Sequence, residues 1–350
     1  MGPIQSLIEQ GAAQHVYSCA AYAIGTPDRL LKEGYAGCLG EGRAAAEQDT
    51  IYDLASVTKV LVTMAFMRLF EQGKVCLEDT IALYLPQYRA TNKETITLWQ
   101  LLTHTSVLHG QAPLYRSAHT KEDLLEAIRQ LPPRDNSTVE YSSQGFIVLG
   151  QVMEAIEDKA LDQILQEQLF TPLNMEHTTY NPPAAWQSRI ASTENCPWRG
   201  HVVIGQVHDE NAVVLGGVAA HAGIFSNTQD LIQVARAMLT GRTPEGQRYL
   251  HEATIRLMTQ DHTGAMKGTQ LARGLGWQVK SAHRPSPFGD LFSAASYGHT
   301  GFTGTGIFID PTRQLFTVLL TNRVHPTRHG SGIEHIRRTF NNLAVLLAEE

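Results

Sequence analysis

The hydrophobic positions of the chain are spaced differently near its two ends and in its middle. Near both ends, short apolar runs are bounded by glycine or by turn residues, a pattern typical of β-strands. The last two runs are separated by residues 310–314, whose Asp-Pro-Thr sequence is a strong turn signal. The runs that predict strands are residues 14–25, 34–40, 275–280, 306–309 and 315–320, with residues 26–34 connecting the first two.

Most of the chain between these strands, and its last residues, have apolar positions at helical spacing. In the helix predicted for residues 56–73, only Thr63 and Arg68 are polar between Val60 and Phe70. A helix that is apolar almost all round is buried, so we expect this one to run through the centre of the protein. The predicted helices are residues 56–73, 98–103, 121–130, 145–156, 161–169, 230–239, 254–258 and 334–348.

This order of elements predicts the fold class. Because strands occur near both ends and the middle is helical, both ends can share one antiparallel sheet flanked by helices. We therefore expect an α+β fold in which residues 1–75 and 271–350 form a discontinuous sheet domain. Residues 76–270 would form an inserted, mainly helical lobe, with the active site in the cleft between the two parts.

Composition and charge narrow the classes of function. The 350 residues are 43% hydrophobic and 18% charged, with a formal net charge of -6 and no basic run, so a nucleic-acid partner is not expected. No window reaches 18 uncharged apolar residues, and the N-terminus lacks a basic region followed by an apolar run. We expect a cytoplasmic protein without a membrane partner, whose four scattered cysteines are reduced.

Ser56 and Lys59 open the apolar helix and are candidates for nucleophilic chemistry. Side chains three residues apart on a helix share one face, about 5–6 Å apart at Cβ. A serine becomes a good nucleophile only when a base takes its proton, and burial favours the neutral lysine that can accept or relay that proton. In the alternative interpretation, Ser56 only caps the helix and Lys59 extends to the surface.

Two distant segments can supply the remaining parts of such a site. Tyr141 precedes an apolar helix, and a phenol beside an ammonium group can act as a general base. His299, Thr300 and Gly301 precede the last hairpin. A Thr-Gly step on an edge strand lets a substrate backbone approach closely and offers a backbone N–H to an oxyanion.

With these three motifs in this order, the sequence resembles the serine β-lactamase and penicillin-binding-protein superfamily. The resemblance is closest to its class C-like branch, which contains esterases, D-peptidases and muramyl-peptide amidases. It covers most of residues 40–325. The segments that carry it are TIYDLASVTKVL, GKVCLEDTIALYLP, ITLWQLLTHTS, YSSQGFIVLGQVMEAI, LFTPLNMEHT, VHDENAVVLGGVAAHAGIFS and GHTGFTGTGIFIDP.

The resemblance implies the fold named above, a β-lactamase/transpeptidase-like fold, and roles for individual residues. Ser56 resembles the nucleophile that is acylated, and Lys59 resembles its proton partner. Tyr141 resembles the general base that also protonates the leaving group. The backbone N–H groups of Ser56 and Phe302 would form the oxyanion hole, and residues 299–301 would form the strand motif beside the substrate.

Three residues depart from the pattern of the family. Ser143 stands where many members have asparagine, which weakens a contact to a substrate amide. His299 replaces lysine, and its charge depends on its surroundings. Phe302 replaces a serine or threonine whose hydroxyl suits a substrate carboxylate. These departures disfavour efficient β-lactam hydrolysis and favour an ester or a different amide.

The sequence therefore predicts a serine hydrolase that cleaves a small carboxylic ester or amide through an acyl-enzyme at Ser56, with an ester as the expected substrate. It needs neither a metal nor an organic cofactor. The alternatives are a D-alanyl-D-alanine carboxypeptidase or muramyl-peptide amidase, a weak β-lactamase, and a penicillin-binding sensor that does not turn over. The sequence leaves the oligomeric state open.

Other polar segments carry weaker signals. The fifteen histidines raise the possibility of a metallohydrolase, but no HExxH motif occurs. The one pair of histidines spaced four residues apart, His325 and His329, lies in a predicted loop. The Gly-rich segment 216–223 lacks the lysine of a phosphate-binding loop, so it is interpreted as a wall of the cleft, with His221 as a candidate substrate contact. Residues 209–211 are either a solvated loop or a polar rim of the substrate site.

Overall fold

The computed structural model describes residues 2–264, 266, 272–282 and 285–350. Within these residues, one antiparallel sheet has seven strands in the order β2-β1-β12-β11-β10-β9-β8, so strands from both ends of the chain lie side by side. This arrangement confirms the predicted α+β class and its antiparallel sheet. The strands are β1 (Cys19–Gly25), β2 (Leu30–Gly37), β8 (Ala272–Arg273), β9 (Gln278–Val279), β10 (Tyr297–Thr300), β11 (Gly306–Asp310) and β12 (Leu315–Thr321).

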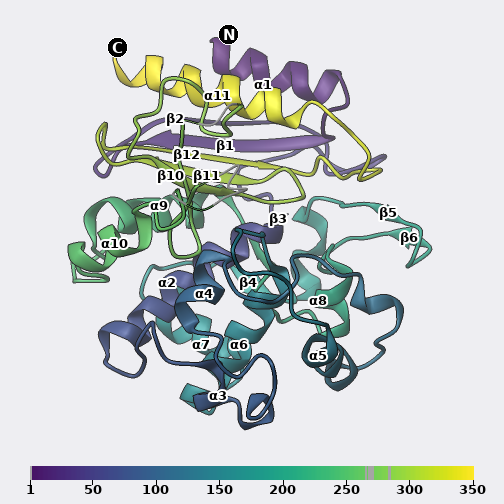
Figure 1. Ribbon diagram of the computed structural model, residues 1–350. Coiled ribbons are helices and arrows are strands. Elements are labelled where there is room, and N and C mark those ends of the chain that lie inside the picture. Colours follow the sequence, from purple (N-terminus) through teal and green to yellow (C-terminus); the bar gives the residue numbers. More distant parts are fainter. Residues whose placement is uncertain (1, 265, 267–271, 283–284) are drawn as a thin grey trace.

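Two helices cover the outer face of this sheet. α1 (Pro3–Ala13) and α11 (Ile333–Ala348) lie next to each other across it, which brings the two ends of the chain together (Figure 1). They pack on a hydrophobic cluster that includes Tyr22 and Phe340, whose rings meet edge to face with centroids 5.5 Å apart. The outer layer therefore joins the first and last elements of the sequence.

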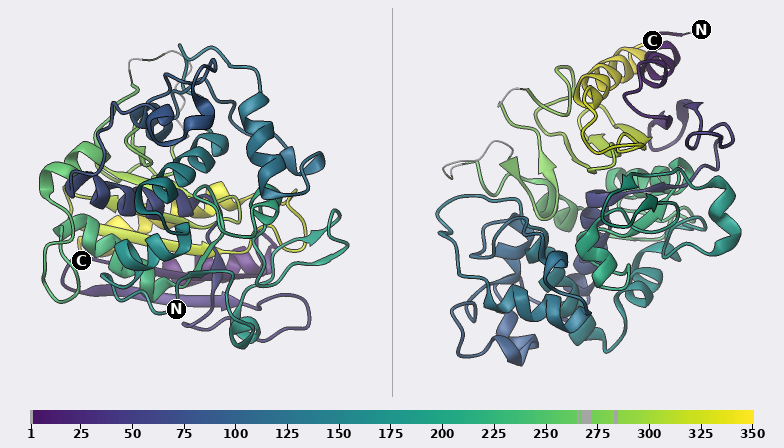
Figure 2. Two further views of the ribbon diagram at one scale, coloured as in Figure 1. Left: turned by 90° about the horizontal axis from the view of Figure 1, so that it is seen from below. Right: turned by 90° about the vertical axis from the view of Figure 1, so that its right-hand side faces the viewer.

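The inner face of the sheet is covered by α9 (Thr228–Thr240), which packs against β1, β11 and β12. The remaining helices lie below it and surround α2 (Thr58–Glu71), as Figures 1 and 2 show. They are α3 (Ile81–Tyr84), α4 (Leu98–Thr103), α5 (Lys121–Gln130), α6 (Ser143–Glu157), α7 (Leu161–Leu165), α8 (Glu210–Val214) and α10 (Glu252–Thr259).

The central position predicted for the first long helix is confirmed. In α2, all residues from Thr58 to Met67 are buried, including both threonines and Lys59. Because the helix is enclosed on all sides, its sequence has no polar face. The start of this helix is thereby fixed in the middle of the molecule.

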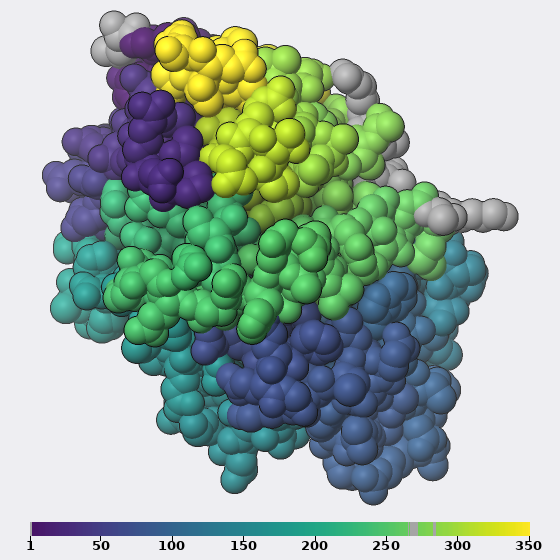
Figure 3. Space-filling model, turned by 90° about the vertical axis from the view of Figure 1, so that its left-hand side faces the viewer, coloured from purple at the N-terminus to yellow at the C-terminus, as the bar shows by residue number. Residues whose placement is uncertain are grey.

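The division into a sheet domain and a helical lobe at residues 75/76 and 270/271 stays a prediction. α9 falls within the range predicted for the lobe but packs on the sheet. In Figure 3, residues of α9 and α10 (green) form a band between the C-terminal part of the chain (yellow) and the blue helical segments. α9 and α10 therefore lie between the large sheet and the other inner helices.

Two details of the sequence prediction near the N-terminus are wrong. The predicted hairpin exists, but the second strand begins at Leu30, so only residues 26–29 connect β1 to β2. Thr26 closes this short turn by accepting the backbone N–H of Arg29 and donating its own N–H to the Arg29 carbonyl. Residues 14–18 precede the strand and follow α1, a helix that the pattern analysis missed.

The strand predicted at residues 275–280 is shorter than expected, since β9 contains only Gln278–Val279. Small additional sheets are formed by β3 (Tyr52–Asp53), β7 (Ile224–Ser226) and β4 (Thr179–Tyr180), and by β5 (Asn195–Cys196) with β6 (His201–Val202). Within the described part of the chain, no helix combines the length and apolar character needed to cross a membrane.

Candidate active site

The segment that carries Ser56 is held in an unusual backbone conformation. It leaves β3 and passes through one 3-10 turn, Ala55–Val57, before α2 begins. Ala55 has a φ of 46°, in the left-handed region that residues with a Cβ rarely occupy. The Asp53 carboxylate stabilises this turn by accepting the Ala55 N–H at 2.8 Å. The turn places Ser56 at the entrance of the helix.

The loop that follows β10 fixes the same segment from the other side. The hydroxyl of Thr303 donates to the Asp53 carbonyl at 2.8 Å, and that of Thr305 donates to the Leu54 carbonyl at 3.0 Å. A Cβ at Gly301 would lie only 2.5 Å from the Leu54 carbonyl oxygen, so only glycine allows this approach. The loop that contains the predicted Thr-Gly motif is therefore packed against the segment just before Ser56.

Lys59 is the second residue of α2 and is fully buried. Its Nζ donates to Ser56 Oγ at 3.2 Å and to the His221 carbonyl at 2.9 Å. The His221 ring is in turn held by a 2.9 Å contact between its Nε2 and Asp209 Oδ1. The interpretation of Lys59 as a surface lysine is wrong, and the pairing expected of a nucleophile and its proton partner is present.

Tyr141, which lies two residues before α6, is the third member of the predicted catalytic group. Its ring centroid lies 4.8 Å from Lys59 Nζ, and its hydroxyl is buried without a hydrogen-bond partner in the described residues. Ser142 caps α6 by accepting the Gly145 N–H at 2.9 Å, which fixes the backbone next to Tyr141. The phenol is thus held beside the lysine with its oxygen free for proton transfer.

Histidines pack against the tyrosine on two sides. The rings of His104 and His299 lie 4.7 Å and 5.9 Å from the Tyr141 ring, centroid to centroid. Burial lowers the pKa of His299 well below its usual range, and the nearby positive charges of Arg273 and Lys59 lower it further. His299 Nδ1 faces the Thr300 carbonyl at 2.8 Å. His299 is therefore neutral at physiological pH, so it does not supply the charge of the lysine that it replaces.

These groups open onto a cavity of about 300 Å³. Six of the predicted residues line it, namely Ser56, Tyr141, His299, Thr300, Gly301 and Phe302. Lys59, Ser143 and His221 do not. Lys59 lies behind Ser56, Ser143 is buried at the first turn of α6, and the His221 carbonyl holds Lys59. The sequence analysis missed the other polar lining residues, which are Gln111, Arg273, Gln278, Arg323, Glu334 and Arg337.

Comparison with known proteins identifies the family of the chain. The model of the family described as Beta-lactamase matches residues 4–339 of the chain. The chain belongs to the beta-lactamase family. The resemblance inferred from the motifs is thereby confirmed, and the chain is a serine hydrolase of this family.

Several known proteins are similar to this chain over most of their length. A protein of Escherichia coli K12 named "Putative D-alanyl-D-alanine carboxypeptidase" is 33% identical over 318 residues, which cover 82% of this chain and 72% of that protein. A penicillin-binding-protein homologue from Caulobacter crescentus has a TM-score of 0.77 at 17% identity, with 97% of this chain and 96% of that chain covered. A class C beta-lactamase from Rhodobacter sphaeroides has a TM-score of 0.74 at 18% identity, covering 98% and 99%. These two structures confirm the predicted fold.

Residues 209–211 are neither a solvated loop nor a rim of the cavity in this member of the beta-lactamase family. Asp209 caps α8 by accepting the Ala212 N–H at 2.8 Å, in addition to its contact with His221. Burial raises the pKa of Asp209, but the adjacent His221 and the hydrogen bonds to its carboxylate outweigh burial, so the pKa lies well below its usual range. Asn211 accepts the Tyr115 N–H at 2.9 Å. These residues support the wall behind Lys59.

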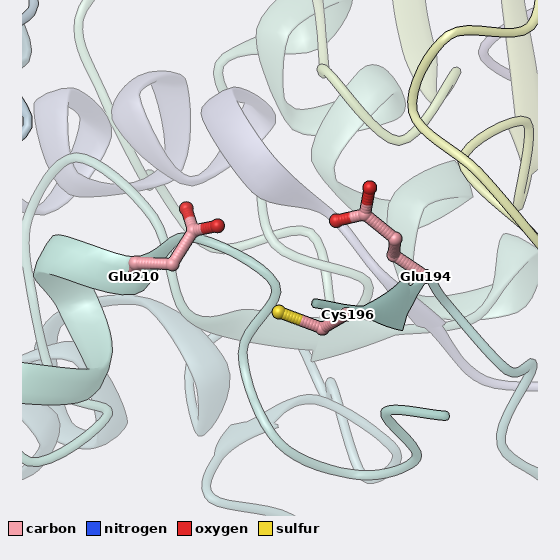
Figure 4. A group of neighbouring side chains, drawn as sticks. All are labelled: Glu194, Cys196 and Glu210. Atoms are coloured by element: carbon pink, nitrogen blue, oxygen red, sulfur yellow. The ribbon is translucent and has the colours of Figure 1, made fainter. Parts of the chain in front are cut away.

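One cluster outside the cavity has the residue types of a metal site. Glu194, Cys196 and Glu210 place one potential ligand atom each within 4.8 Å of the others (Figure 4). Both carboxylates already bind Arg328, and His208 Nε2 contacts Glu194 at 3.0 Å. A metal ion would have to displace this guanidinium, so we interpret the cluster as a structural ion-pair network.

Proposed function

We propose that the protein is a carboxypeptidase of the D-alanyl-D-alanine type, which releases the last residue of a peptide through an acyl-enzyme at Ser56. The observation that carries this proposal is the cation in the wall of the cavity. Arg273 is buried, and its guanidinium Nε and Nη1 have no hydrogen-bond partner in the described residues. A buried cation needs an anion, and the terminal carboxylate of a peptide is one.

Arg273 lies on the same side of the cavity as the proposed base. Its Cζ is 5.1 Å from the centroid of the Tyr141 ring. Burial lowers the pKa of Arg273 to about 10, which still leaves the guanidinium charged at neutral pH. A carboxylate bound to it would hold the last peptide bond next to Ser56. The name of the Escherichia coli relative supports the same choice of substrate.

The proposed reaction uses only groups of this chain and water. Ser56 Oγ attacks the carbonyl carbon while the phenolate of Tyr141, kept anionic by the neighbouring Lys59 ammonium, takes its proton and becomes a neutral phenol. The C–N bond breaks, and Tyr141 returns the proton to the departing amine. Water then attacks the ester at Ser56 and releases the acid, with Tyr141 again as the base. The backbone N–H groups of Ser56 and Phe302 are the proposed oxyanion donors.

A fluorophosphonate probe tests the nucleophile. Wild-type protein should be labelled, and Ser56→Ala should not be labelled. The matched control is Ser143→Ala, which removes the other serine of the predicted motifs and should keep its labelling. Labelling that survives in Ser56→Ala would refute the assignment of the nucleophile.

A matched pair of peptides tests the substrate class. One ends in D-alanyl-D-alanine and the other carries a carboxamide in place of the terminal carboxylate. We expect a kcat/KM at least tenfold higher for the free acid, because an ion pair to a buried charge is worth about 1.5–3 kcal/mol. Arg273→Gln should abolish this preference. Rapid cleavage of p-nitrophenyl esters without cleavage of either peptide would instead support the esterase that the sequence favoured.

A further inference from the structure

A second buried cation lines the same cavity. Arg337 reaches it from α11 and, like Arg273 from β8, has only 6% of its surface exposed. Its Nη2 makes one long contact of 3.4 Å to the Gly304 carbonyl, and its Nε has no hydrogen-bond partner in the described residues. In the described residues neither guanidinium lies within ion-pair distance of a carboxylate, and burying arginines without such a pair is costly.

The third arginine of the cavity, Arg323, already has hydrogen-bond partners within the protein. Arg323 Nε donates to the Phe302 carbonyl at 2.6 Å, and its Nη1 donates to the carbonyls of Arg328 and Gly330 at 3.2 and 3.4 Å. Glu334 is the one acidic side chain among the described residues that line the cavity, and the same lining contains three arginines. The cavity therefore has an excess of positive charge that one substrate carboxylate would not neutralise.

The two unpaired guanidinium groups form separate positive centres. Arg273 lies over the Tyr141 ring, whereas Arg337 contacts the Gly304 carbonyl in the loop after β10. The Glu334 carboxylate and the Arg323 guanidinium act on Arg337 in opposite directions, and Tyr141 is the titratable group that acts on Arg273. A ligand that satisfies both centres must therefore carry two acidic groups at different positions.

The residues that line the cavity also supply two hydrogen-bond acceptors. The Oε1 of Gln278 and the Nε2 of His299 are buried without a hydrogen-bond partner in the part of the chain that the structure describes. Because His299 Nδ1 faces a carbonyl oxygen and carries the proton, Nε2 is an acceptor. Two acceptors suit the N–H groups of an amine. Together, these atoms complement an amino acid that has one amine and two carboxylates.

From this arrangement, and resting on the carboxypeptidase function proposed above, we infer that the released residue is a dicarboxylic amino acid, such as glutamate or aspartate. Arg273, beside the base, takes one carboxylate, and Arg337 takes the other. A cavity of about 300 Å³ is at the small end of ligand sites and suits a single residue on the leaving side. The covalent chemistry is unchanged: the C–N bond of the last residue breaks, and its amine leaves with the proton from Tyr141.

Three peptides that differ only in their last residue test this inference. They end in D-glutamate, in its neutral isostere D-glutamine, and in D-alanine. For wild-type protein we expect a kcat/KM for the glutamate peptide at least tenfold higher than for the glutamine peptide. Arg337→Gln should reduce this ratio to about one, and Arg337→Lys should restore part of it. The matched control is Arg338→Gln, the next arginine on α11, which should keep the wild-type ratio.

A measurement on wild-type protein guards against a variant that fails to fold. Free D-glutamate should inhibit as a competitive product at least tenfold more strongly than D-glutamine. If the D-alanine peptide is cleaved but glutamate gives no advantage over glutamine in rate or inhibition, the dicarboxylate inference is overturned and the carboxypeptidase function stands. If none of the three peptides is cleaved while small esters are, the carboxypeptidase function itself is refuted.

Discussion

Replacing the buried His104 by asparagine should change how the stability of the protein depends on pH. The Nδ1 of His104 accepts the Ser142 N–H at 3.0 Å, a contact that the asparagine oxygen can keep. Burial lowers the pKa of His104 well below its usual range, and the charges of Arg273 and Lys59 lower it further. His299 and Arg134 also face it and act in the same direction.

The sign and size of the effect follow from proton binding. Below about pH 6.5 the unfolded chain binds a proton at residue 104 that the folded protein does not bind, so acid favours unfolding. This stability is fully present above the unfolded pKa and is lost as the pH falls, by about 1.4 kcal/mol per pH unit. Between pH 7.5 and 5.5, we expect wild-type protein to lose about 1.4 kcal/mol through His104 alone.

Urea unfolding, followed by the fluorescence of the four tryptophans, measures this difference at the two pH values. His104→Asn should be less stable than wild type at pH 7.5, because the asparagine fills less of the space beside Tyr141 and Phe146. Its deficit should shrink by about 1.4 kcal/mol at pH 5.5, since the asparagine has no proton to bind. The matched control His335→Asn removes an exposed histidine of α11. A deficit that is the same at both pH values would refute the reasoning.

Three further substitutions address the site itself. Gly301→Ala places a Cβ 2.5 Å from the Leu54 carbonyl oxygen, so it should displace the segment before Ser56 and lower kcat/KM about 100-fold. Lys59→Met removes the proton partner and should lower the rate of acylation by about 10²–10⁴-fold in stopped-flow labelling. Asp209→Asn weakens the support of His221 and should lower kcat about tenfold with little change in KM.

Each of these expectations has a contrary outcome. Wild-type kinetics in the Gly301 variant would show that the contact with Leu54 does not position the nucleophile. Acylation that is unchanged in the Lys59 variant would assign the proton transfer to another group. An Asp209 variant that changes KM rather than kcat would mean that this carboxylate acts on substrate binding and not on Lys59.

The sequence predicted site residues best where they are close together in the chain and share one helical segment. Ser56 and Lys59 could be paired because helical spacing alone places them together, and the apolar sequence of α2 indicated that both would be inside. Tyr141 and Gly301 required the resemblance to the family, since no local rule connects residues so far apart.

The residues that the sequence did not indicate depend on tertiary contacts. Arg273 and Arg337 are isolated arginines, and a charged residue is usually interpreted as part of a solvated surface. Only the assembled sheet shows that β8 and the first turns of α11 bring both into the cavity that contains Ser56. α1 was missed for a related reason. It buries only Ile4, Ile8 and Gly11, a short stripe that is weak without the sheet beneath it.

Phe302 shows how the sequence and the structure lead to different substrates. From the sequence, the loss of a hydroxyl at this position disfavoured a carboxylate and favoured an ester. In the structure, the Phe302 ring stacks on His208 and lies 4.4 Å from the guanidinium carbon of Arg323. Its carbonyl also accepts a hydrogen bond from Arg323. Phe302 therefore positions the Arg323 guanidinium and offers no hydroxyl to a substrate. We infer that the arginines around the strand motif, and not the motif itself, bind an acidic leaving group.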